Sequence, residues 1–164
     1  MQLKRLFLIS LLLVSCAKKV PLVETTKAPL EEITEESATP QRSASMRFVE
    51  KGRDEIAQQR YERAIAQLTR AIEIDASNPF AYFYLGYTRF LTGNFEQAKD
   101  LFRRSGDLFT KLDNWRAESY AYSGESYEKL TKTELAKKMY NKAIEVDNHN
   151  ERAQAGLERL KPSG

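Results

Sequence analysis

The chain has 164 residues, of which 41% are hydrophobic and 30% are charged. This length allows one compact domain with tails and argues against two full-sized domains. The mean hydropathy of −0.57 excludes a protein that crosses a membrane many times. The single cysteine, Cys16, excludes a disulfide framework and a cysteine-rich zinc site, and the single histidine, His149, leaves little for histidine-based catalysis or metal binding. The 26 basic and 23 acidic side chains give a formal charge of +3, so the basic character is slight.

Residues 1–15 have the pattern of an export signal. Lys4 and Arg5 precede an apolar run at residues 6–14, and small residues follow it. A charged start, a short apolar core and small residues afterwards are the plan of a secretory signal peptide. The run is about half of the ~20 residues that a helix needs to span a bilayer, so we do not expect a permanent transmembrane anchor.

The apolar run ends in Leu13-Val14-Ser15-Cys16, which resembles the lipobox of bacterial lipoproteins. The resemblance implies cleavage before Cys16, a diacylglyceryl group on its sulfur, and an acyl chain such as palmitate on its freed amine. Three chains anchor far better than one, because each buried CH₂ adds about 0.8 kcal/mol to membrane affinity. Ala17 follows in place of aspartate, which by resemblance favours the outer membrane, facing the periplasm, if the source has two membranes. The alternatives are an ordinary signal peptide cleaved near Ala17 and an uncleaved signal anchor.

Residues 16–44 comprise this cysteine and a segment with the composition of a disordered tether. The segment contains three prolines, Pro21, Pro29 and Pro40. No apolar helical face is sustained between them, and the segment buries too little surface to offset the entropy of ordering it. Random-coil scaling gives the 28 residues after the cysteine a mean reach of roughly 30 Å. A short helix around residues 30–36 remains open, as does whether the tether is a functional spacer or passive filler.

The sequence from residue 45 onward repeats itself with a period of 34 residues. Residues 61–65 align with residues 95–99 at that spacing, and residues 133–137 follow 38 residues later, as if four residues were inserted. Three glycines, Gly52, Gly86 and Gly124, recur at one constant distance ahead of three alanines, Ala64, Ala98 and Ala136. A glycine inside a helix costs up to ~1 kcal/mol, so these glycines indicate points where another helix approaches closely, as the alanines would allow.

This pattern resembles the tetratricopeptide repeat, a helix–turn–helix unit whose signature includes Leu-Gly, aromatic residues and alanine. The three copies span residues 45–78, 79–112 and 117–150. The middle copy carries Leu85-Gly86, and it begins at Asn78-Pro79, which is typical of a helix N-terminus. The resemblance implies an all-α fold, a right-handed superhelical stack of three tetratricopeptide helix pairs (an α-solenoid).

Residues 151–161 have the spacing of one further helix. Its apolar side consists of Ala153, Leu157 and Leu160. Repeat stacks need such an end cap to protect their last apolar face. We therefore predict one repeat domain at residues 45–164, with three helix pairs and a C-terminal capping helix. The alternative is a three-helix bundle with accidental periodicity.

No catalytic set is recognisable in the sequence. The glycine pattern is that of the repeat, not of a phosphate-binding loop. His149 lies in a predicted turn, and Glu125 and Glu128 share a helix, where carboxylates are usually solvated. The basic pairs at residues 103–104 and 137–138 are short and interspersed with acidic residues, which is typical of outer helix faces. We therefore expect no enzymatic activity, no cofactor, no metal ion and no nucleic-acid partner.

Repeat stacks of this family bind their partners on the concave side, which is lined by the first helix of each pair. Carried over to this sequence, that side combines an aromatic centre in the middle repeat with an acidic flank in the third. The predicted groove residues are Phe80, Phe83, Tyr84, Tyr87, Phe90, Leu91, Glu118, Tyr122, Glu125 and Glu128. These aromatic residues exceed what helix pairing needs, and interfaces favour such rigid anchors. The alternative is that part of this stripe packs against the tether or against a second copy of the chain.

The resemblance implies a non-enzymatic protein–protein interaction scaffold. We expect a lipid-anchored protein of the bacterial cell envelope that captures an extended or helical segment of an envelope protein, within an assembly machine. The alternative is a self-associating structural lipoprotein that uses the aromatic stripe as an oligomer interface. Removal of residues 1–15 leaves 24 basic and 23 acidic side chains, so we expect the mature chain to be nearly neutral.

Overall fold

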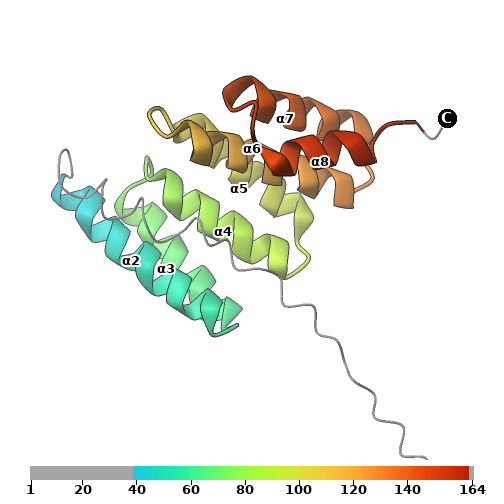
Figure 1. The fold of residues 1–164 in the computed structure, drawn as a ribbon. Helices are drawn as coiled ribbons and strands as arrows, with labels where there is room; N and C mark the ends of the chain where they lie inside the picture. Colours follow the sequence, from blue (N-terminus) through green and yellow to red (C-terminus); the bar gives the residue numbers. More distant parts are fainter. Residues whose placement is uncertain (1–38, 163–164) are drawn as a thin grey trace, which may run out of the picture.

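A computed structural model describes residues 39–162 of the chain (Figure 1). This part contains seven helices and no strand. The helices are α2 (Pro40–Ala57), α3 (Tyr61–Ile74), α4 (Pro79–Leu91), α5 (Phe95–Leu108), α6 (Asp113–Lys129), α7 (Thr133–Val146) and α8 (Glu151–Arg159). None of these helices is long and apolar enough to cross a membrane. The predicted all-α fold is confirmed.

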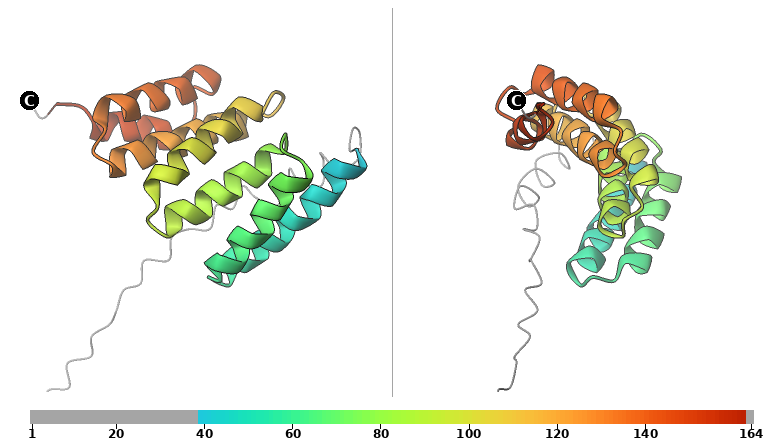
Figure 2. Two further views of the ribbon diagram at one scale, coloured as in Figure 1. Left: turned by 180° about the vertical axis from the view of Figure 1, so that it is seen from behind. Right: turned by 90° about the vertical axis from the view of Figure 1, so that its right-hand side faces the viewer.

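Consecutive helices form antiparallel pairs, and the pairs stack into a curved array (Figures 1 and 2). The three predicted repeats are the pairs α2–α3, α4–α5 and α6–α7, and α8 packs on both α6 and α7. Helix α2 contacts α4, and α6 contacts α8, so first helices of successive repeats are neighbours. We call the side formed by α2, α4, α6 and α8 the inner face. The described chain is thus the predicted superhelical stack of three helix pairs with a capping helix.

Two glycines let three helices converge on one tyrosine. A Cβ atom at Gly124 of α6 would lie 2.7 Å from Cδ1 of Tyr140, and one at Gly156 of α8 would lie 2.3 Å from Cζ of the same ring. Close helix approach at Gly124 was expected, but the neighbouring group differs from the prediction. The large Tyr140 ring, not the small Ala136, fills the space beside the glycine, and Ala136 is fully buried elsewhere in the interface.

Asparagine side chains cap three of the described helices: Asn78 at α4, Asn94 at α5 and Asn150 at α8. The Oδ1 atom of Asn78 accepts a hydrogen bond of 3.1 Å from the backbone N–H of Phe80, and Pro79 occupies the first turn of α4, as the sequence predicts. Asn78 is fully buried and also donates through Nδ2 to Oγ of Ser45, at 2.8 Å. Asn150 caps α8 in the same way, with a bond of 2.9 Å from Ala153 N–H. These caps fix the start of each helix and tie α2 to α4.

The N-terminal boundary of the domain differs from the prediction. Helix α2 begins at Pro40, so residues 40–44, which we assigned to the tether, are helical. Oγ1 of Thr39 caps the helix by accepting a bond of 3.1 Å from Arg42 N–H, and the Arg42 guanidinium pairs with Asp75 at the end of α3. The composition of residues 40–44 indicated disorder, but the contact of Arg42 with Asp75, just after α3, holds them in the helix. The signal peptide, Cys16 and tether residues up to 38 lie outside the described part of the chain.

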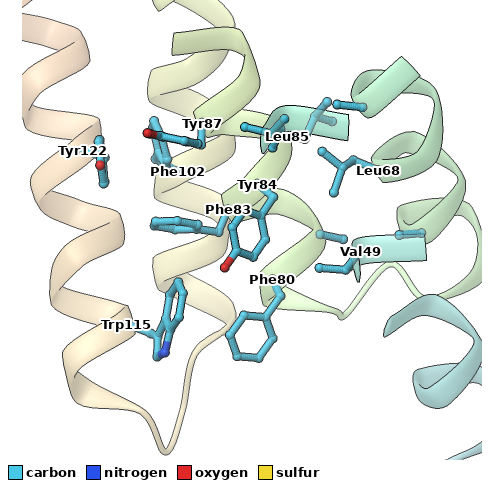
Figure 3. Close-up of a cluster of buried hydrophobic side chains, with 14 of the residues drawn as sticks. Val49, Leu68, Phe80, Phe83, Tyr84, Leu85, Tyr87, Phe102, Trp115 and Tyr122 are labelled. Carbon is cyan, nitrogen blue, oxygen red and sulfur yellow. The ribbon is translucent and has the colours of Figure 1, made fainter. Parts of the chain in front are cut away.

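The core consists of two clusters along the stack. The first lies between α2, α3, α4, α5 and the start of α6, and it is rich in aromatic rings (Figure 3). The second joins α6, α7 and α8 around Tyr120 and Tyr140. The four residues inserted before the third repeat form the first turn of α6 and carry Trp115 into the first cluster. Trp115 of this insertion thus helps to cover the aromatic residues of α4, together with Tyr122 further along α6.

Candidate partner-binding face

The predicted aromatic groove residues of α4 lie mostly in the core. The relative exposures are 1% for Phe80, 1% for Phe83, 4% for Tyr84 and 6% for Tyr87. Phe90 and Leu91 are partly buried against the same cluster. The structure therefore brings these side chains together, but as packing residues.

Helix α6 covers this stripe. The ring centroid of Phe83 lies 5.0 Å from that of Trp115, 5.7 Å from that of Tyr122 and 5.5 Å from that of Phe102, all edge to face (Figure 3). Tyr122 also stacks on Phe102, with centroids 4.9 Å apart. Edge-to-face aromatic contacts at such distances stabilise a core beyond the area they bury.

The prediction that these rings exceed the needs of helix packing is therefore wrong. They fill the space between α4, α5 and α6. The same burial leaves the alternative of self-association through this stripe without support, because the rings are already covered within one chain. Tyr122, predicted as part of the groove, is also only 3% exposed.

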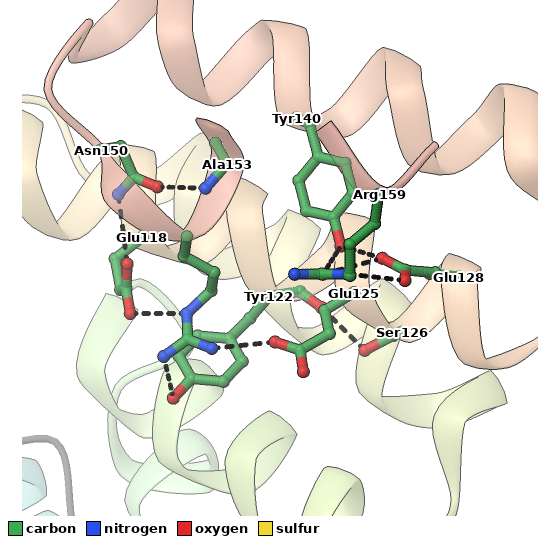
Figure 4. Close-up of polar contacts among 10 residues, drawn as sticks. Glu118, Tyr122, Glu125, Ser126, Glu128, Tyr140, Asn150, Ala153 and Arg159 are labelled. Carbon is green, nitrogen blue, oxygen red and sulfur yellow. Dashed lines mark hydrogen bonds and ion pairs between the residues drawn. The ribbon is translucent and has the colours of Figure 1, made fainter. Parts of the chain in front are cut away.

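The predicted acidic residues of α6 do lie on the inner face, but arginines of α8 pair with them (Figure 4). The Arg152 guanidinium donates to Glu118 at 2.9 Å, to Glu125 at 2.8 Å and to the hydroxyl of Tyr122 at 2.9 Å. Its carbon Cζ lies 3.8 Å from the centroid of the Tyr122 ring, which adds a cation–π contact. One arginine thus joins three side chains of α6 that the sequence places on successive turns.

A second arginine closes the far end of the same interface. Arg159 donates two bonds of 3.0 Å to the carboxylate of Glu128, which also accepts a bond of 2.7 Å from the hydroxyl of Tyr140 (Figure 4). These hydrogen bonds, the one from Arg159 foremost, hold the pKa of Glu128 below its usual range. Burial raises the pKa of Tyr140, and the neighbouring carboxylate adds to the rise. The Glu128 carboxylate is therefore stabilised in its charged form.

A cleft lies between α6 and α8, beside these ion pairs. Its volume is about 540 Å³, and its lining residues are Glu125, Glu128, Lys129, Glu151, Arg152, Ala155 and Arg159. The lining carries three acidic and three basic side chains and one small apolar residue. Within the described chain, the side chains of Lys129 and Glu151 form no ion pair, although four of the other lining groups are paired. The cleft therefore presents one unpaired positive and one unpaired negative group.

Sequence reasoning missed Trp115, Arg152 and Arg159. The two arginines lie on α8 and their glutamate partners lie 27 to 34 residues earlier on α6, so no local spacing in the sequence indicated this pairing. Trp115 lies in the insertion, which breaks the repeat register and so has no counterpart in the other copies.

The described chain shows no further chemical centre at this face. Residues 39–162 contain no group of three or more His, Cys, Asp or Glu side chains placed to hold a metal ion. The side chain of His149 is 90% exposed in the turn before α8.

Models of one repeat family match three segments of the chain. The model described as "TPR repeat" matches residues 52–93, and two models described as "Tetratricopeptide repeat" match residues 80–111 and 117–150. A comparison with the curated proteins gives no match.

Several solved structures share the fold. The N-terminal domain of stress-induced protein-1 from C. elegans is 17% identical, with 76% of this chain and 100% of that chain covered and a TM-score of 0.69. The second TPR domain of human RPAP3, in complex with the HSP70 peptide SGPTIEEVD, is 20% identical, with coverages of 75% and 99% and a TM-score of 0.67. The Sgt2 TPR domain from Aspergillus fumigatus is 19% identical, with coverages of 78% and 89% and a TM-score of 0.65.

Identities at this level show the fold alone. The family models, by contrast, match the sequence itself: two of them cover the helix pairs α4–α5 and α6–α7, and the third runs from the end of α2 through α3 and α4. Together the three matches span more than half of the chain, and the chain therefore belongs to the tetratricopeptide-repeat family.

Proposed function

We propose that this protein is a non-enzymatic interaction scaffold that binds a segment of another protein in the cleft between α6 and α8. The observation that carries the proposal is the cleft itself, which is about 540 Å³ in volume and lined by charged groups of both signs. A cleft of this size fits a few residues of a peptide chain. The cleft replaces the aromatic stripe of α4 as the proposed contact region.

The chemistry of the lining favours a polar segment of mixed charge. Lys129 offers a positive group for a carboxylate, and Glu151 offers a negative group for a basic side chain. Ala155 leaves room between them, because its side chain ends at Cβ. The peptide complex of the RPAP3 domain supports a peptide as the ligand class, since that domain has the same fold.

A photo-crosslinking amino acid at Ala155 tests this assignment in cells. Ala155 is exposed and lines the cleft, whereas Leu135 on α7 is 45% exposed and does not line it. We expect crosslinks to one recurrent protein from position 155 and none to that protein from position 135. Charge reversal at both Lys129 and Glu151 should abolish the specific crosslink while the circular dichroism spectrum is unchanged. Equal crosslinking from both positions would show that the cleft is not the binding site.

The proposal includes a lipid anchor at Cys16 and a place in the bacterial cell envelope. Its support is the sequence Leu13-Val14-Ser15-Cys16 after a charged start and a short apolar run. If the source has two membranes, Ala17 favours the outer membrane, with the domain facing the periplasm. The scaffold would then capture an envelope protein close to the membrane surface.

Metabolic labelling with radioactive palmitate tests the anchor separately. The wild-type chain should incorporate label and remain in the membrane fraction. Cys16→Ser should lose both the label and the membrane association, because no other cysteine can replace it. Label that persists in Cys16→Ser would refute lipidation at this residue and leave the cleft assignment untouched.

A further inference from the structure

The two walls of the cleft between α6 and α8 run in the same direction. Near the start of α8, Arg152 donates to Glu118 and Glu125 of α6. Further along α8, Arg159 donates to Glu128, which lies further along α6 (Figure 4). Because the partners advance together along both helices, positions in the cleft can be compared along one axis.

The two unpaired charges of the cleft lie at its opposite ends. Glu151 is the first residue of α8. Lys129 is the last residue of α6 and follows Glu128, so it lies at the level of Arg159. From Glu151 to Arg159 the chain advances eight residues, which is a rise of about 12 Å in a helix. The negative group and the positive group are therefore about 12 Å apart along the cleft.

Ala155 lies midway between these ends. It is four residues from Glu151 and four residues from Arg159, so the three positions share one face of α8. Ala155 is exposed, and its side chain ends at Cβ, which leaves space for one side chain of a ligand. The cleft thus offers three positions in line: a negative group, a small apolar surface and a positive group.

The size of the cleft favours an extended chain over a helix. A helix about 12 Å long and about 10 Å in diameter occupies about 900 Å³. This exceeds the cleft volume of about 540 Å³. An extended segment of the same length, about 5 Å by 10 Å in section, occupies about 600 Å³. Its alternate side chains point to one side, and residues four positions apart are separated by about 13 Å, which matches the distance between the two charges.

We propose that the cleft takes an extended segment that carries a basic, a small apolar and an acidic residue at alternate positions. The basic side chain pairs with Glu151, the apolar side chain contacts Ala155, and the acidic side chain pairs with Lys129. This assignment rests on the proposed function, because it specifies what the partner presents to the cleft. Either chain direction satisfies the arrangement, so the cleft recognises the spacing of the charges and not their order.

Synthetic peptides test the spacing directly. Each peptide is capped at both ends, bears a fluorophore, and carries one lysine, one glutamate and one valine among serines. The matched peptide has its charges four positions apart with the valine midway, and the short-spaced peptide has its charges two positions apart. Fluorescence anisotropy measures binding to the full-length protein in lipid nanodiscs. We expect the short-spaced peptide to bind about 2- to 5-fold more weakly, because it can form only one of the two exposed ion pairs at a time.

A charge reversal in the cleft should change which peptide is preferred. In Lys129→Glu both ends of the cleft are negative, so a third peptide, with lysine at both charged positions, should bind more tightly than the matched peptide. The wild type should prefer the matched peptide. The control is Lys138→Glu, which makes the same charge change at an exposed position of α7 outside the cleft and should keep the wild-type preference. Circular dichroism checks that both variants are folded.

Equal binding of the matched and short-spaced peptides, or an unchanged preference in Lys129→Glu, would overturn the proposal. Tighter binding of an alanine-rich helical peptide with its charges seven positions apart would also overturn it, in favour of a helical ligand. If no peptide binds while Ala155 still crosslinks to one recurrent protein, this proposal fails and the proposed function stands. Loss of the specific crosslink from Ala155 would instead overturn the proposed function.

Discussion

The Arg152 contacts provide the sharpest test of how α8 is held on the stack. The guanidinium donates three hydrogen bonds of 2.8–2.9 Å, to Glu118, Glu125 and Tyr122. Hydrogen bonds to charged groups contribute about 1.5–3 kcal/mol each when fully buried. The Arg152 side chain is 30% exposed and the two carboxylates are 21% exposed, so about 1 kcal/mol each is a better estimate after solvent screening.

The contact with the Tyr122 ring adds about 0.5–1 kcal/mol. Arg152→Ala should therefore lower the free energy of unfolding by about 3.5–4 kcal/mol, part of which comes from two carboxylates left close together without a cation. Urea unfolding followed by circular dichroism measures this loss. The matched control is Lys161→Ala, which breaks an exposed pair with Glu158 (side chains 64% and 67% exposed) and should cost less than about 0.5 kcal/mol.

A double-mutant cycle with Glu118→Gln separates the pairwise part of this energy from the rest. We expect the loss caused by Arg152→Ala to be smaller in the Glu118→Gln background, because one of its partners is already changed. A loss below about 1 kcal/mol for Arg152→Ala, or one equal to that of the lysine control, would refute the assignment of this arginine as the main link between α6 and α8.

Gly156→Ala should destabilise the domain by about 1–3 kcal/mol, because the new Cβ would lie 2.3 Å from Cζ of Tyr140. This cost should outweigh the preference of alanine for helices, so the midpoint of thermal unfolding should fall. A raised midpoint would contradict the tight packing of Gly156 against Tyr140. The pKa of Glu128 is lower in the folded chain than in the unfolded chain, so its contribution to stability is complete above the unfolded value of about 4.3 and is lost as the pH falls through the folded value. Unfolding free energies measured between pH 6 and pH 3 should therefore fall less steeply for Glu128→Gln than for the wild type. Parallel curves would show that Arg159 does not stabilise the charged form of Glu128.

The helix pairs could be predicted from the sequence because their signals are local and periodic. Asn78-Pro79 marks the start of α4, and the spacing of glycines identifies the faces where helices meet. The structure confirms close helix approach at these glycines, although larger side chains such as Tyr140 at Gly124, and not the predicted alanines, lie against them. The start of α2 carries a similar local signal, Thr39-Pro40, which we assigned to the tether; the pairing of Arg42 with Asp75 just after α3 could not be read from local sequence.

The candidate site was only partly predictable, for a geometric reason. Helical periodicity indicates which residues share a face, but it does not indicate how closely the next helix approaches that face. The stripe from Phe80 to Tyr87 was expected to be open, but Trp115 of the inserted turn and Tyr122 further along α6 cover it. Glu118 and Glu125 were placed on the correct side, whereas their pairing with Arg152 depends on a contact between residues 27 and 34 positions apart in the chain.

The polar outer side of α8 limits how long this array can grow. Helix α8 takes the place of a first helix, yet its exposed positions carry Gln154 and Glu158, and Pro162 follows the helix within three residues. A fourth repeat added by duplication would have to bury these polar groups and continue the chain through the proline, so tandem expansion at this end requires several substitutions at once. The same polar side makes Lys161 a suitable position for fusing a tag, because a tag attached there would not contact an exposed apolar helix face.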